Sequence, residues 1–157
     1  MQAARTIYRY WITLLWLAVV VQISAAAYGA FYSADKLSSQ TGPDEERTIS
    51  ETIFDHGFAF HSAFGYIVFL ASLVLLVLAL FARPGKRGTW LAAAVPIAVA
   101  VQIVLAWASE GTHGVGVFHG LNALVIFALT GYLTREAWQA HRASAAVEAP
   151  ATQAPAT

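Results

Sequence analysis

Four long stretches without a charged side chain constrain the fold of this chain more than any other feature. Each stretch is about the length of the roughly 20 residues that a helix needs to cross a hydrocarbon core. With 58% hydrophobic and 11% charged residues, the chain is also too apolar for an ordinary soluble domain. The uncharged stretches are residues 12–31, 58–81, 90–107 and 115–133. The sequence therefore predicts an all-α, four-helix transmembrane bundle with helices at about 10–32, 54–82, 89–109 and 114–135.

Charged residues are distributed unevenly between these stretches, which predicts the orientation in the membrane. The connection 32–57 is mainly acidic, and the connection 108–114 carries only Glu110. Basic residues lie before the first stretch, between the second and third, and after the fourth: Arg5, Arg9, Arg83, Lys86, Arg87, Arg135 and Arg142. By the positive-inside rule, both termini are expected in the cytoplasm. The expected location of the protein is a bacterial cytoplasmic membrane. Residues 1–142 form the expected transmembrane domain, and the Ala- and Pro-rich residues 143–157 are expected to be a disordered cytoplasmic tail.

The third stretch repeats the first, and the fourth repeats the second. Residues 18–23 (AVVVQI) match residues 98–103 (AVAVQI) at five of six positions. Residues 56–61 (HGFAFH) and 113–119 (HGVGVFH) share a His-Gly start and a Phe-His end. Both matches fall in the same order and include polar residues that are rare in membranes. We therefore predict two parallel-repeat helical hairpins related by an axis along the membrane normal, with the second and fourth helices facing each other.

Histidines in the second and fourth stretches are the strongest indication of chemistry. Coordinating side chains inside a lipid-spanning segment are costly and usually functional. His61 and His119 occupy equivalent positions in the two repeats, so a ligand on the axis would receive one imidazole from each. This arrangement predicts one haem b per chain, with its iron bound by these two side chains. The alternative interpretation is that the histidines form hydrogen bonds between helices without a cofactor.

Small residues flank both histidines. Gly57 and Gly65 lie four residues before and after His61, on the same helix face. Gly116 and Asn122 give the second histidine a looser version of this arrangement. Because a porphyrin is a flat plate, small neighbours on the ligand face make room for it. Small residues at this spacing also allow transmembrane helices to pack closely without any cofactor, so both interpretations stay open.

The remaining polar residues of the repeats are weaker candidates for the cofactor site. His56 and His113 are rotated by about 140° and 120° from the ligand face at 3.6 residues per turn. Contact with haem propionates, proton exchange, a small metal site or simple solvation would each suit them. Gln22 and Gln102 are expected to bind the free ring nitrogens of the histidines and orient them, as outer-shell partners do. Ordinary interhelical hydrogen bonding is the alternative, and Asn122 is a further candidate of the same kind.

Composition excludes several other classes of function. The chain contains no cysteine, which rules out disulfides, thiolate metal sites and covalent attachment of a c-type haem. No glycine-rich phosphate loop or serine–histidine nucleophile pair is recognisable. The formal net charge is zero, which gives no reason to expect a nucleic acid partner.

The helix order, the two histidines and the Gln-Ile step of the third helix resemble one half of the haem A synthase family. They are also similar to small four-helix membrane proteins with the same histidine pattern. That family has two such bundles in tandem, each with haem ligands on its second and fourth helices, so the resemblance implies that His61 and His119 are axial haem ligands. The resemblance does not extend to the enzyme activity. The family has a glutamate and an arginine where this chain has Phe58 and Ser62, and the family's extracellular cysteine pair is absent.

The expected function is that of a small b-type cytochrome near the outer membrane face. Two axial histidines leave no open position on the iron, which favours electron transfer over oxygen chemistry and argues against a haem-modifying oxidase. The expected partners are membrane lipid and either quinone or a respiratory complex, and the apolar outer faces also suit a homodimer. Two alternatives stay open, a haem-handling or haem-sensing protein and a cofactor-free accessory subunit of a respiratory membrane complex.

Overall fold

The computed structural model describes residues 2–42, 47–109 and 112–148, and these form four helices and no strand. Helix α1 spans Gln2–Ser38, α2 spans Glu51–Ala82, α3 spans Gly85–Ser109 and α4 spans His113–Glu148. All four are long and apolar enough to cross a membrane, judged by length and composition. The prediction of an all-α protein with four apolar helices is therefore confirmed.

The first and last helices, α1 and α4, are longer than expected from the sequence. Helix α1 begins at Gln2 and ends at Ser38, beyond both limits of the expected range 10–32. Helix α4 continues to Glu148, so residues 143–148, expected to begin the tail, are helical. Three of these six residues are alanine, the strongest helix former. The rest of the expected tail, residues 149–157, lies outside the described residues.

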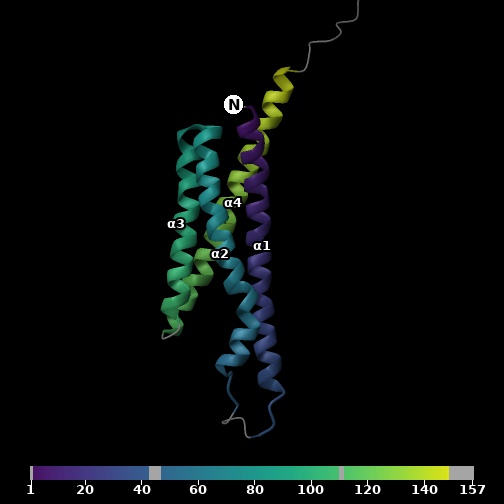
Figure 1. Cartoon of the computed structure of the whole chain (residues 1–157), viewed down its shortest axis with the longest axis vertical. Coiled ribbons are helices and arrows are strands. Elements are labelled where there is room, and N and C mark those ends of the chain that lie inside the picture. The colour runs from purple at the N-terminus through teal and green to yellow at the C-terminus, as the bar shows by residue number, and fades with distance from the viewer. Residues whose placement is uncertain (1, 43–46, 110–111, 149–157) are drawn as a thin grey trace, which may run out of the picture.

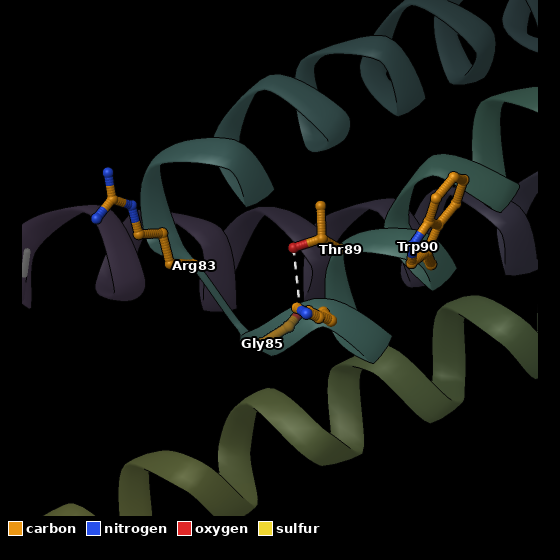
Figure 2. A pocket seen from close by; sticks show the side chains of 5 residues that line it. Arg83, Gly85, Thr89 and Trp90 are labelled. Atoms are coloured by element: carbon orange, nitrogen blue, oxygen red, sulfur yellow. Dashed lines mark hydrogen bonds between the residues drawn. The ribbon is translucent and has the colours of Figure 1, made fainter.

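Local signals explain where α2 begins and ends. Ser50 is the N-cap, and its hydroxyl accepts a hydrogen bond from the backbone N–H of Ile53 at 3.3 Å. Arg83 ends the helix in the left-handed conformation, with φ of 52°. Pro84 follows, and a proline cannot continue a helix. Figure 2 shows this turn, in which the Thr89 hydroxyl donates to the carbonyl of Gly85 at 3.1 Å and so joins the first two turns of α3.

The helices form a ring in which each one packs against two neighbours. Helix α2 packs against α1 and α3, and α4 packs against α3 and α1. The backbones of the diagonal pairs, α1 with α3 and α2 with α4, are not in contact within the described residues. In Figure 1, the start of α1, the end of α4 and the α2–α3 turn lie at one end of the molecule. We call this the basic end, because it carries Arg5, Arg9, Arg83, Lys86, Arg87, Arg135 and Arg142.

The buried core lies mainly in the half of the bundle next to the basic end. Its largest fully buried side chains are Ile12, Leu75, Val95 and Leu133, one from each helix. The buried residues of α3 all precede Gln102, and those of α4 all follow the predicted ligand on that helix. Toward the opposite end, α1 and α2 stay together while α3 and α4 lie apart from them (Figure 1). The two hairpins therefore share a core in one half of the molecule only.

Candidate functional site

The two predicted ligands face each other across the bundle. The imidazole rings of His61 on α2 and His119 on α4 have their centres 6.3 Å apart, with 62° between the ring planes. Both side chains are partly buried. Because the α2 and α4 backbones are not in contact, the two imidazoles approach each other over the diagonal of the ring of helices. The two side chains therefore lie close together, while the pairing of the second and fourth helices as parallel repeats stays a prediction.

His61 is fixed by a reciprocal contact with Gln22 on α1. Its Nδ1 lies 3.1 Å from the main-chain oxygen of Gln22, and the side-chain amide of Gln22 donates to the main-chain oxygen of His61 at 2.7 Å. Since a carbonyl oxygen can only accept, this bond requires the proton to be on Nδ1. The Nε2 atom of His61 then carries the free lone pair that a metal needs.

The second hairpin contains the same contact, atom for atom. The Nδ1 atom of His119 lies 3.1 Å from the main-chain oxygen of Gln102 on α3. The side-chain amide of Gln102 donates to the main-chain oxygen of His119 at 3.0 Å. The glutamines therefore do pair with the histidines, but not as expected, since the main-chain carbonyl binds the imidazole and the amide binds the main chain.

The two glutamines differ in their remaining contacts. Asn122 donates to Oε1 of Gln102 at 2.7 Å and to the main-chain oxygen of Ala98 at 2.9 Å. Asn122 thus holds Gln102 and makes no hydrogen bond with the imidazole of His119. Oε1 of Gln22 is buried and has no hydrogen-bond partner among the described residues. The position corresponding to Asn122 in the first hairpin is Phe64, which cannot donate.

The small residues near the histidines have different surroundings. Gly57 is buried against α1, where an added Cβ would lie 3.0 Å from the main-chain oxygen of Gly29. At Gly65, an added Cβ would lie 3.1 Å from the Gln22 amide nitrogen. Gly116 is exposed and meets only Ser109, at 4.0 Å. Gly57 therefore allows close packing of α1 and α2, and Gly65 makes room for the glutamine that binds His61.

Of the other two predicted histidines, His56 does not join this cluster. His56 is exposed, and its Nδ1 lies 2.8 Å from the main-chain oxygen of Thr52 in its own helix. His113 is the first residue of α4, but its side chain lies outside what the structure describes. The ring beside His61 is instead Phe58, which meets it edge-on at a centre distance of 6.1 Å. In the sequence, Phe58 stands out only as the residue that replaces the glutamate of the haem A synthase family, which does not predict a ring contact with His61.

The number of protein ligands limits the kind of metal site. Within the described residues, no group of three or more His, Cys, Asp or Glu side chains is placed to hold a metal ion. The pair of facing imidazoles offers two nitrogen ligands. A structural or catalytic zinc site takes three or four protein ligands, whereas a haem iron has four porphyrin nitrogens and needs at most two more. The donor set fits a haem iron better than a bare metal ion.

Comparisons with known proteins place part of the chain beside one family. The model of a family of unknown function (DUF6220) matches residues 52–110. This range contains His61 and Gln102 but neither Gln22 nor His119, and it spans less than half of the 157 residues. The chain is thus similar to that family over α2, α3 and the turn between them. No curated protein and no solved structure matches the chain.

Proposed function

We propose that this chain is a membrane cytochrome that holds one haem b between His61 and His119 and transfers electrons. The observation that carries the proposal is the facing pair of imidazoles, whose ring centres are 6.3 Å apart. A metal–imidazole bond is about 2 Å long and the nitrogen lies about 1 Å from its ring centre, so two imidazoles on opposite sides of one metal would have centres about 6 Å apart. The observed separation supports one iron between the two rings.

The contacts of the two imidazoles also suit metal ligands. Each Nδ1–H donates to a main-chain oxygen, of Gln22 or of Gln102. A hydrogen bond of this kind fixes the tautomer and the ring orientation of a metal-bound histidine and raises its basicity. The chain's own residues would therefore hold the ligand rings in place before any cofactor binds. A haem with two imidazole ligands supplies reversible one-electron transfer.

The same contacts support an internal duplication. Each hairpin joins a glutamine on its first helix to a histidine on its second through the same four atoms. We infer two parallel repeats related by an axis along the membrane normal, with the cofactor on that axis. The positive-inside rule then puts the basic end in the cytoplasm, in a bacterial cytoplasmic membrane, with the histidine pair nearer the outer face. Quinone or a respiratory complex would be the electron partner.

Haem content of histidine variants tests this proposal. The purified wild-type chain is expected to hold about one haem b, and His61→Ala and His119→Ala are each expected to lose nearly all of it. His56→Ala is the matched control, because it removes an exposed imidazole from the same helix as His61 and should leave the haem content unchanged. Circular dichroism of each variant is the check that it is folded. A folded His61→Ala or His119→Ala variant with the wild-type haem spectrum would refute the ligand assignment.

A haem-handling role is the second candidate, and the exposure of the site favours it. Both histidines are only partly buried, and Ser62, Gly116 and Gly120 beside them are exposed. A cofactor at the margin of the shared core would leave more easily than one enclosed by it. Haem transfer to apomyoglobin separates the two roles. Transfer within seconds would indicate delivery, whereas retention over hours would indicate a resident electron carrier.

A further inference from the structure

A cavity lies at the basic end of the bundle, away from the histidine pair. Its volume is about 720 Å³, and its walls come from α1, α4 and the α2–α3 turn. Three arginines line it, Arg5 and Arg9 from α1 and Arg83 from the turn. The only carboxylate among its lining residues is Glu136, which accepts a hydrogen bond from the hydroxyl of Tyr132. Positive charge therefore predominates around the cavity.

Arg9 is a buried cation without an anionic partner. Only 7% of its surface is exposed, and no ion pair or hydrogen bond connects its guanidinium group to any other described residue. Its Nε is buried without a hydrogen-bond acceptor. The guanidinium carbon lies 4.8 Å from the ring centre of Trp138 and 5.2 Å from that of Tyr10. These cation–π contacts orient the guanidinium but do not replace the hydrogen bonds that it loses on burial.

The neighbouring Tyr8 provides a second unsatisfied donor to the same cavity. This side chain is 4% exposed, and its hydroxyl is buried with no partner among the described residues. Leaving a buried polar group unpaired costs about 1–3 kcal/mol, and more for a charged group. Two such donors at one cavity, one of them cationic, indicate that an acceptor with negative charge completes the site.

The location of the cavity indicates where that anion comes from. The uncharged stretch of α1 begins at Ile12 and that of α4 ends at Leu133, so the cavity lies where apolar helix surface gives way to charged residues. Lipid headgroups occupy this level of a membrane, and basic pockets between helices bind anionic headgroups. Arginine is also the side chain best suited to phosphate, because its planar fork can donate two parallel hydrogen bonds.

We propose that this cavity binds a phosphate group, and that Arg9 and Tyr8 are its direct hydrogen-bond donors. An anionic phospholipid headgroup and free phosphate share this chemistry, and the level of the cavity favours the lipid. The site does not include either histidine of the pair, so failure of one proposal leaves the other unaffected.

Native mass spectrometry of the full chain from detergent tests this site with three probes, phosphatidylglycerol, phosphatidylcholine and inorganic phosphate. We expect wild type to retain one phosphatidylglycerol in preference to phosphatidylcholine. Arg9→Gln should weaken that retention by about 10-fold or more, and Tyr8→Phe by about 2- to 10-fold, as expected for charged and neutral donors. Arg135→Gln is the control, since Arg135 is exposed at the same end but does not line the cavity.

Each outcome decides the proposal. Loss in Arg9→Gln and Tyr8→Phe with retention in Arg135→Gln supports a lipid headgroup. Binding of inorganic phosphate with the same dependence on Arg9, without retained lipid, supports a free anion in the same site. Retention of both lipids equally by all variants, or no binding of any probe to wild type, overturns it. Tyr8→Phe keeps the test valid if Arg9→Gln fails to fold, because it removes only a hydroxyl.

Discussion

The amides of the two site glutamines are satisfied to different degrees. Oε1 of Gln102 accepts from Asn122, whereas Oε1 of Gln22 is buried without a partner. Both amide nitrogens donate to the main chain of a histidine. The first hairpin therefore carries the cost of an unpaired acceptor that the second hairpin avoids. This difference comes from single residues, since Phe64 stands in the first hairpin at the position that Asn122 occupies in the second.

Alanine substitution should reveal this inequality. Gln102→Ala removes two hydrogen bonds of a connected network, while Gln22→Ala removes one bond together with the unpaired oxygen. Interhelical hydrogen bonds in membranes contribute about 0.6 kcal/mol on average and up to about 1.7. We expect Gln102→Ala to lower the free energy of unfolding by about 1 kcal/mol more than Gln22→Ala, measured by unfolding in mixed micelles with increasing SDS. Equal losses would show that the Asn122 contact contributes nothing.

The sequence could predict which residues form this cluster but not which atoms meet. Histidine and glutamine are rare in apolar helices, and their repetition at matched positions identified all four. Whether an amide or a carbonyl meets an imidazole depends on the rotation and separation of two helices by a fraction of a turn. Gly57 illustrates the same limit, because its position relative to His61 suits a porphyrin, yet its Cβ direction points to α1.

At the helix scale, the backbones of α1 and α2 approach each other closely at the end opposite the basic end. A Cβ at Gly29 would lie 2.8 Å from the ring of Phe58 and 2.9 Å from the main-chain oxygen of Gly57. This approach continues the α1–α2 contact beyond the limit of the shared core. Nothing in the sequence singled out Gly29, because the contact depends on where the two helices cross. The helix ends were likewise predicted only approximately, since alanine-rich and polar residues extend α4 past the apolar stretch.

An added methyl group at this crossing should weaken the packing of α1 against α2. Gly29→Ala forces atoms of Phe58 and Gly57 to move, and overpacking of this kind costs about 1–3 kcal/mol. Gly114→Ala is the control, because an added Cβ there meets nothing within 4 Å and alanine is the better helix former. The same SDS unfolding measurement compares them. If Gly29→Ala is as stable as wild type, the close approach of α1 and α2 is absent in the membrane.

At the scale of the whole molecule, the basic residues and the buried apolar core are both concentrated at one end. The basic end carries six of the seven arginines, the cavity and most of the buried side chains, while the histidine pair lies where the shared core stops. Four charge-free stretches were sufficient to predict four helices. Their ring order and the one-sided core could not be predicted, because helices with apolar residues on all faces do not indicate which face contacts a neighbour.

Topology reporters test the orientation that follows from this distribution of charge. A fluorescent protein fused after residue 148 should fluoresce, and alkaline phosphatase inserted between residues 39 and 50 should be active, because positive charge stays in the cytoplasm. The reverse pattern would put the basic end outside. A reporter in the α2–α3 turn should match the C-terminal one, since both lie at the same end of the bundle (Figure 1).

The reduced-minus-oxidised optical spectrum of the purified chain, with haem quantified per chain, tests the central claim most directly. The two facing imidazoles predict a six-coordinate b-type spectrum at about one haem per chain, unchanged by carbon monoxide because no iron position is open. A folded chain that stays colourless after haem is supplied, or a haem that binds carbon monoxide at once, would contradict axial ligation by His61 and His119.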